Sequence, residues 1–132
     1  MIIGIHHAHV TIPKGTEEEG KAFYCGILGL PEIEKPASLK GRGGFWVKAG
    51  GTDLHIGTED GFDRFTTKAH IAYQVDDLPY WRNKLEQHAI KCTPGIPIPG
   101  FDRFEFRDPF GNRVEMIQAV LATEQASEGE QA

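Results

Sequence analysis

Hydrophobic and polar residues alternate in two stretches of the chain, and each stretch opens a similar series of elements. In residues 4–12, Ala8, Val10 and Ile12 fall on one face of an extended chain and polar side chains fall on the other. Residues 70–75 show the same alternation. A period of two is typical of strands that bury one face, so we expect a strand at each place.

Apolar residues recur at helical spacing after each of these strands, in residues 16–28 and 78–87. Thr16 precedes Glu19 by three residues, which is the spacing of a capping box. Asp77 stands directly before the second segment and can cap it. We therefore predict two helices, each with a polar residue at its start.

Strand-like segments then complete two series with the same order, each a strand, a helix and three strands. These segments are residues 32–35, 44–48 and 53–57 in the first series, and 90–93, 103–107 and 113–118 in the second. The ends of the series also match, because His7 corresponds to His70 and His55 to Glu115. The sequence therefore predicts an α+β fold made of two tandem βαβββ modules.

The predicted modules cover residues 4–58 and 68–120. Each module is too short to bury a stable hydrophobic core alone, so we expect the two modules to form one domain over residues 1–122. Residues 123–132 are polar and are expected to form a disordered tail.

Strand parity places four residues with metal-binding side chains on one side of the predicted sheets. His7, His55, His70 and Glu115 alternate with apolar residues that face the helices, so they project from the opposite, concave face. If the modules pair as half-barrels about a pseudo-twofold axis, these positions converge on one cleft. Three imidazoles and a carboxylate suit one divalent ion, with Zn, Ni, Co, Mn and Fe as the candidates.

Each of these four residues has a more ordinary interpretation when it is taken alone. A single histidine on a strand is usually a satisfied surface or core residue, and a single glutamate is usually solvated. The combination, on one face and at symmetric positions, favours a metal site.

Four further side chains are candidates for substrate contacts. His9 shares the face of His7 and could contact a substrate, support a ligand or simply fill space. Arg103 or Arg107 could hold an anionic substrate, and a solvated strand face is the other interpretation for at least one of them. Trp46 could line the cleft or pack in the core, because its short strand does not fix the parity.

Composition narrows the range of partners. The chain has 14 basic and 19 acidic residues, a formal charge of −5 and no basic cluster, which disfavours nucleic acid. No apolar run is long enough to span a bilayer, and the N-terminus does not resemble a signal peptide. Cys25 and Cys92 fit reduced core thiols. We therefore expect a cytoplasmic protein that binds a small molecule.

Four runs of sequence resemble the vicinal oxygen chelate superfamily, and the resemblance extends over about residues 4–120. This group includes glyoxalase I, extradiol dioxygenases, fosfomycin-resistance transferases and bleomycin-binding proteins. The resemblance implies paired modules around a cleft, with a metal bound by His7, His70 and Glu115. The runs are residues 5–12, 23–30, 70–77 and 108–115, and the last, Asp-Pro-Phe-Gly-Asn-Arg-Val-Glu, is the most specific.

His55 departs from the glyoxalase I pattern, in which a carboxylate tends to occupy this position as ligand and base. An imidazole titrates near neutral pH and could take both roles, or it could mark a different reaction. His55 and Glu115 are therefore the candidate catalytic residues.

Three functions are compatible with the resemblance. The first is a metal-dependent lyase or isomerase acting on a small oxygen-chelating substrate, such as a hemithioacetal. The second is an extradiol-type dioxygenase, in which two histidines and one glutamate hold iron and His55 is an acid or base. The third is a resistance protein that sequesters or modifies an antibiotic. The complete ligand set argues against a metal-free binder, and the first is the function that we expect.

We also expect a homodimer, because half-barrel modules leave sheet edges that need to be covered. The modules could pair within one chain or between chains. In the exchanged arrangement, His7 and His55 of one chain would meet His70 and Glu115 of the other.

Overall fold

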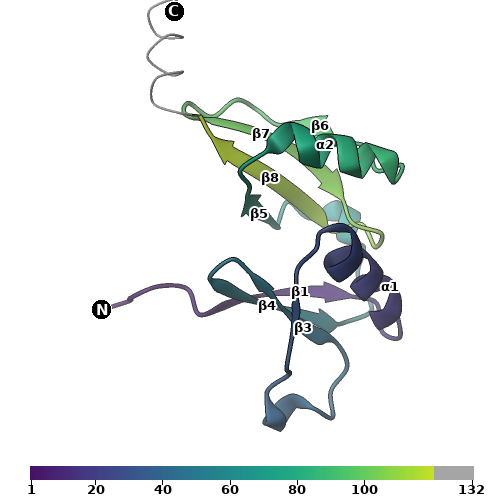
Figure 1. The fold of residues 1–132 in the computed structure, drawn as a ribbon. Helices are drawn as coiled ribbons and strands as arrows, with labels where there is room; N and C mark the ends of the chain where they lie inside the picture. The colour runs from purple at the N-terminus through teal and green to yellow at the C-terminus, as the bar shows by residue number, and fades with distance from the viewer. Residues whose placement is uncertain (121–132) are drawn as a thin grey trace, which may run out of the picture. The chain divides into compact units, whose positions relative to one another are not determined.

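The computed structural model describes residues 1–120. The described residues form two compact units, which divide between Asp63 and Arg64 (Figure 1). Each unit contains one four-stranded mixed sheet. The predicted tail, residues 123–132, lies outside the described residues.

The first unit contains a sheet in the order β1-β4-β3-β2, in which β1 and β4 are parallel and the other neighbours are antiparallel. Its predicted helix is divided into an α-helical and a π-helical part. The elements are β1 (His7–Ile12), α1 (Glu17–Lys21), the π-helical η1 (Ala22–Ile27), β2 (Glu32–Ile33), the 3-10 turn η2 (Ala37–Leu39), β3 (Phe45–Ala49) and β4 (Thr52–Thr58).

The second unit repeats this topology with the order β5-β8-β7-β6, and β5 and β8 are again parallel. Its elements are the 3-10 turn η3 (Arg64–Thr66), β5 (His70–Gln74), α2 (Leu78–Gln87), β6 (Thr93–Pro94), β7 (Phe101–Arg107) and β8 (Arg113–Ala119). The predicted α+β fold with two βαβββ modules is confirmed.

The strand register confirms the alignment of the two repeats. Parallel pairing of β1 with β4 places His55 two residues beyond the partner of His7. Pairing of β5 with β8 places Glu115 two residues beyond the partner of His70. The first and last strands of both units therefore present their candidate ligands at equivalent positions.

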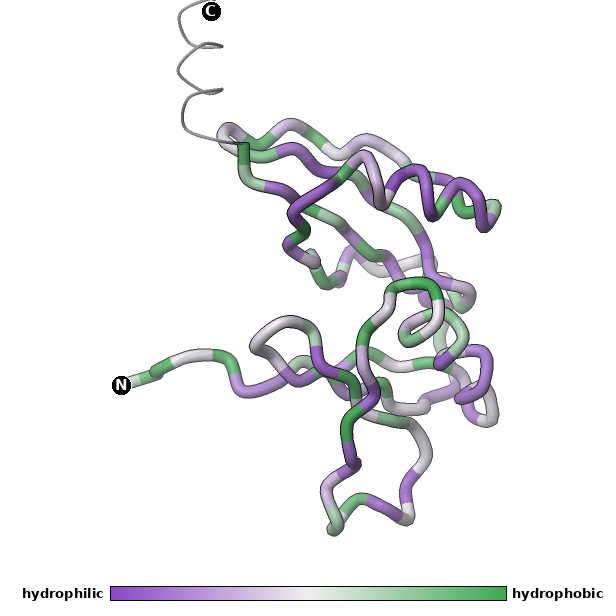
Figure 2. The backbone as a smooth tube through the Cα atoms, viewed as in Figure 1, coloured by the Kyte–Doolittle hydropathy of each residue, from purple (hydrophilic) through white to green (hydrophobic). Residues whose placement is uncertain are grey.

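Each unit has an apolar core on one face of its sheet. Figure 1 shows α2 lying along the sheet that contains β7 and β8. Figure 2 shows the hydrophilic positions of α2 interrupted by hydrophobic ones, and Leu78 and Leu85 are its buried residues. The apolar residues that alternate with His55 and Glu115 along their strands were expected to face the helices, and they are buried, namely Leu54, Ile56, Val114 and Met116.

The predicted capping box at the first helix is wrong. The Thr16 hydroxyl makes no capping hydrogen bond and donates instead to the Pro13 carbonyl over 2.6 Å. The turn at Gly15, whose φ is +81°, carries Thr16 back over that carbonyl. The cap predicted for the second helix is confirmed, since Asp77 Oδ1 accepts a hydrogen bond of 3.1 Å from the Tyr80 amide.

The strand predicted at residues 90–93 is also wrong for most of its length, because β6 begins only at Thr93. The Ile90 amide donates to the Leu85 carbonyl over 3.0 Å and closes the end of α2. Ala89 adopts a φ of 60° to allow this closure. The backbone of this segment therefore serves the helix rather than the sheet.

Replacing Ala89 with glycine should stabilise the protein by about 0.5–1 kcal/mol, because the left-handed backbone strains any residue with a Cβ. The measurement is urea unfolding followed by circular dichroism. Ala69→Gly, at an exposed position outside the left-handed region, is the control and should not stabilise. A lower unfolding midpoint for Ala89→Gly than for the natural chain would contradict this account.

Candidate functional site

A hydrogen-bonded turn between β7 and β8 determines where Glu115 lies. The buried Asp108 accepts hydrogen bonds at Oδ1 from the amides of Phe110 and Asn112, at 2.9 and 2.8 Å. Gly111 adopts a φ of +102°, which favours glycine. The sequence motif of residues 108–115 therefore forms a turn that fixes the register in which β8 begins. Glu115, at the end of this motif, is only 4% exposed.

His70 faces Glu115 across the β5–β8 pair, with 3.0 Å between Nε2 and Oε1. The other ring nitrogen, Nδ1, lies 2.8 Å from the Lys68 carbonyl oxygen. A carbonyl only accepts, so Nδ1 carries the proton. Nε2 also faces an acceptor, so either a proton on Nε2 or a cation in its place joins the ring to the carboxylate.

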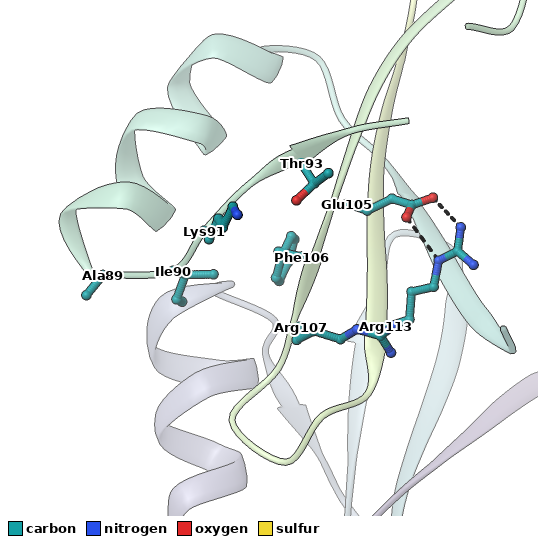
Figure 3. Close-up of a pocket in the computed structure, with 8 residues that line it drawn as sticks. All are labelled: Ala89, Ile90, Lys91, Thr93, Glu105, Phe106, Arg107 and Arg113. Carbon is teal, nitrogen blue, oxygen red and sulfur yellow. Dashed lines mark hydrogen bonds and ion pairs between the residues drawn. The ribbon is translucent and has the colours of Figure 1, made fainter. Parts of the chain in front are cut away.

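Two arginines accompany the carboxylates on this face of the second sheet. Arg103 donates from Nη1 to Glu115 Oε1 over 2.8 Å. Arg113 makes two hydrogen bonds to Glu105, as Figure 3 shows. The hydrogen bond from Arg113, with the charges of both arginines, holds the pKa of Glu105 below its usual range.

The first unit carries a stack of rings at the equivalent positions. The His55 ring lies between those of His9 and Trp46, with centroids 4.0 and 4.5 Å away and interplanar angles of 15° and 5°. Gly57 makes room for this stack, since a Cβ at Gly57 would lie 2.1 Å from Nε2 of His9. The faces of the His55 ring are covered, and its nitrogens lie at the ring edge.

Burial lowers the pKa of His55 to about 4, and the nearby positive charges of His9, Lys35 and His7 add to this effect. His55 is therefore neutral at pH 7. A neutral imidazole retains a lone pair, which both a metal ligand and a general base need.

His7 lies beside this stack, next to Trp46. Nδ1 of the exposed His7 is 2.9 Å from Nδ1 of His6, and its ring centroid is 5.2 Å from that of Trp46. Trp46 is 6% exposed, and its buried Nε1 has no acceptor among residues 1–120. The indole thus offers an unpaired donor close to two of the candidate ligands.

A model of the Glyoxalase/Bleomycin resistance protein/Dioxygenase superfamily matches residues 6–116. This chain belongs to that superfamily. It is 39% identical to a protein from Bacillus anthracis that was solved as a glyoxalase family protein, with a TM-score of 0.84 over 91% of this chain and 98% of that one.

Two further relatives are less similar to this chain in sequence. Glyoxylase I 4 of Arabidopsis thaliana is 25% identical over an alignment of 118 residues that covers 82% of this chain and 67% of the relative. The fosfomycin resistance protein FosX of Listeria monocytogenes, solved with Mn(II) and sulfate, is 19% identical with a TM-score of 0.73, over 98% of this chain and 99% of that one. FosX shares the fold.

The structure groups some of the predicted site residues within each unit. His70, Glu115 and Arg103 are in contact in the second unit, and His9, His55 and Trp46 are stacked in the first. The four predicted ligands are divided between the units. Within either unit, over the described residues 1–120, no three His, Cys, Asp or Glu side chains gather closely enough to hold an ion.

Arg107 lies apart from the contacts of Glu115. Its Nη1 donates to the Gly111 carbonyl over 3.1 Å, and its guanidinium carbon lies 5.7 Å from the centroid of the Phe65 ring. It helps to line a cavity of about 460 Å³, together with Lys91 and Thr93 (Figure 3). The predicted role of Arg107 in holding an anionic substrate stays a prediction.

Sequence reasoning missed two glycines that shape the site. Gly57 accommodates His9, and Gly95 lies against the guanidinium of Arg103. A glycine inside a strand often marks a close approach of another group, and this signal was available for Gly57. For Gly95, in a loop rich in proline and glycine, the sequence carried no comparable signal.

The metal-free protein should lose stability as the pH falls from about 6.5 towards 4, partly because of His55. The unfolded His55 takes up a proton near its ordinary pKa of about 6.5, whereas the folded ring does not, so protonation favours the unfolded state. His55→Gln should flatten this pH dependence. The measurement is urea unfolding at pH 7.5 and pH 5 with a chelator present.

The control for this experiment is His88→Gln, since His88 is exposed at the end of α2. Its pH dependence should match that of the natural chain. Equal slopes in the natural chain and in His55→Gln would show that His55 titrates normally, contrary to this account.

Proposed function

We propose that this protein is a metal-dependent enzyme of the lyase or isomerase type, acting on a small substrate with neighbouring oxygen atoms. One contact carries the metal: Nε2 of His70 and Oε1 of Glu115 face each other at 3.0 Å, where a cation can take the place of a shared proton. Superfamily membership supports the class of enzyme.

The His70–Glu115 pair suits a divalent ion in its geometry and its surroundings. Ligand atoms lie ~2.0–2.2 Å from such an ion, so two ligands at right angles are roughly 3.0 Å apart. The bond from His70 Nδ1 to the Lys68 carbonyl is the support that metal-binding histidines usually have. The Mn(II) in FosX is a further reason to propose a metal here.

His7 is the proposed third ligand, and His55 is either a fourth ligand or an acid–base group. The low pKa of His55 keeps its ring neutral, which suits both roles. Stacking fixes the plane of the ring and leaves its edge available. The ion itself can be Zn, Ni, Co, Mn or Fe, because this set of ligand types suits all of them.

A bound divalent ion would polarise the substrate oxygens as a Lewis acid. The chain supplies the remaining chemistry. His55 is the candidate base that removes a proton from carbon and returns it to a neighbouring position. The buried Trp46 N–H is the candidate donor to a substrate oxygen, since an unpaired buried donor costs about 1–3 kcal/mol.

The stack around His55 favours one alternative function, an extradiol-type dioxygenase. If the two covering rings hold His55 away from the ion, two histidines and one glutamate remain, which is the triad of iron oxygenases. His55 would then act on substrate protons alone. Activity with iron and a catechol, compared with activity on a hemithioacetal, distinguishes the two functions.

We further propose that the protein acts in the cytoplasm as a homodimer and takes small-molecule substrates. Strands β1 and β5 lie at the edges of their sheets, and edge strands are usually covered. Cys25 and Cys92 are both free thiols, as in a reducing compartment. No helix within residues 1–120 is long and apolar enough to cross a membrane.

Removing a ligand should remove the metal. Glu115→Gln and His7→Ala are expected to reduce bound metal to near zero, whereas His55→Ala should retain part of it and lose more in turnover than in metal affinity. Elemental analysis of protein purified without chelators gives the metal content, and hemithioacetal conversion gives the rate. His88→Ala is the control and should resemble the natural chain.

Two results would count against this proposal. Full metal content in Glu115→Gln would remove Glu115 from the ligand set. Full metal and full activity in His55→Ala would make His55 a bystander and favour a three-ligand site.

A further inference from the structure

We propose that Arg103 is a positioning residue that directs the Glu115 carboxylate at the metal, and that the loop of residues 94–100 holds Arg103 in place. This inference rests on the proposed metal site. It concerns a residue that the sequence suggested only as a contact for an anionic substrate.

Arg103 is fixed at both ends of its guanidinium group. Nη1 donates to Glu115 Oε1 over 2.8 Å, and Nε donates to the Ile96 carbonyl over 2.9 Å. A longer contact of 3.5 Å joins Nη1 to Glu105 Oε1. The side chain is only 13% exposed, so it is held by its hydrogen bonds and not extended into solvent.

The loop forms a slot that fits a flat guanidinium group. A Cβ at Gly95 would lie 2.7 Å from Cζ and 2.9 Å from Nε of Arg103. Only a residue without a side chain leaves this space. Prolines 94, 97 and 99 restrict the backbone on both sides of Ile96, which lowers the entropy cost of keeping its carbonyl in place.

The contacts of Glu115 Oε1 leave distinct positions for a metal and for Arg103. A carboxylate oxygen has two lone pairs, and here one is directed at His70 and the other at Arg103. An ion that takes the place of the proton between His70 and Glu115 uses the first lone pair. Arg103 can keep the second, and its charge persists at any ordinary pH.

Two opposite effects on metal binding follow from this arrangement. Positioning of the carboxylate strengthens binding, whereas repulsion between the guanidinium group and a divalent ion weakens it. If replacing Arg103 weakens metal binding, Arg103 is a positioning residue. If the replacement strengthens metal binding, Arg103 mainly repels the ion. We infer that positioning dominates, because the guanidinium group is anchored on Ile96 independently of Glu115.

The test is titration of the metal-free natural chain and its variants with Co²⁺, followed by visible absorption, which reports both affinity and coordination. Arg103→Lys keeps the charge but loses the planar fork, and Gly95→Ala displaces the guanidinium group without changing charge. Both should weaken Co²⁺ binding by about 10–100-fold and alter the absorption bands. Gly95→Ala is the milder change, and it keeps the test possible if Arg103→Lys does not fold.

Matched controls are Arg82→Lys on α2 and Gly41→Ala, where an added Cβ meets nothing within 4 Å. Both should bind Co²⁺ like the natural chain. Unchanged or tighter binding in Arg103→Lys and Gly95→Ala would overturn the proposal. A lower unfolding midpoint with an unchanged Co²⁺ spectrum would show a purely structural role and would overturn it too. Failure of the natural chain to bind Co²⁺ would instead reject the metal site itself.

Discussion

The second unit depends on one constraint, the approach of His70 Nε2 to Glu115 Oε1 at 3.0 Å while Nδ1 of the same ring faces the Lys68 carbonyl. A proton on Nε2, or a cation in its place, makes this contact attractive, and the structure around the pair can also hold it. The surrounding contacts do hold them: the Lys68 carbonyl fixes the imidazole, Arg103 fixes the carboxylate, and the Asp108 turn fixes the register of β8. The parallel pairing of β5 with β8 brings the two residues together from opposite ends of the unit. The fold therefore brings two proposed metal ligands together, with Glu115 buried and His70 partly exposed.

The two units use the same strand positions for different chemistry. Opposite the candidate ligand, β3 of the first unit carries Trp46, and β7 of the second unit carries Glu105. The first unit accordingly surrounds His55 with rings, which exclude water and keep it neutral. The second unit surrounds its carboxylates with arginines, which hold the pKa of Glu105 below its usual range. A repeated backbone thus carries the proposed base in one unit and the proposed pair of metal ligands in the other.

Much of the fold could be predicted from the sequence. The alternation along the strands and the repeated order of elements indicated the correct structure, and tertiary packing did not change it. Glu115 was found through its position in the repeat and through the turn motif before it. The capping box failed because Thr16 turned back to the Pro13 carbonyl, and the strand at residues 90–93 failed because Ile90 closes α2. The contact of Arg103 with Glu115 could not be predicted from the sequence. It depends on the Ile96 carbonyl and on the space left by Gly95, and neither produces a periodic pattern in the sequence.

The most direct test of the metal assignment is the state of the His70 ring itself. Nitrogen NMR of protein labelled with ¹⁵N in its histidines, recorded before and after addition of Zn²⁺, distinguishes the two ring nitrogens of His70. The account predicts that Nε2 moves to the range of a metal-bound nitrogen while Nδ1 keeps its proton on the Lys68 carbonyl. A ring whose two nitrogens are unaffected by Zn²⁺, or one that binds through Nδ1, would contradict it.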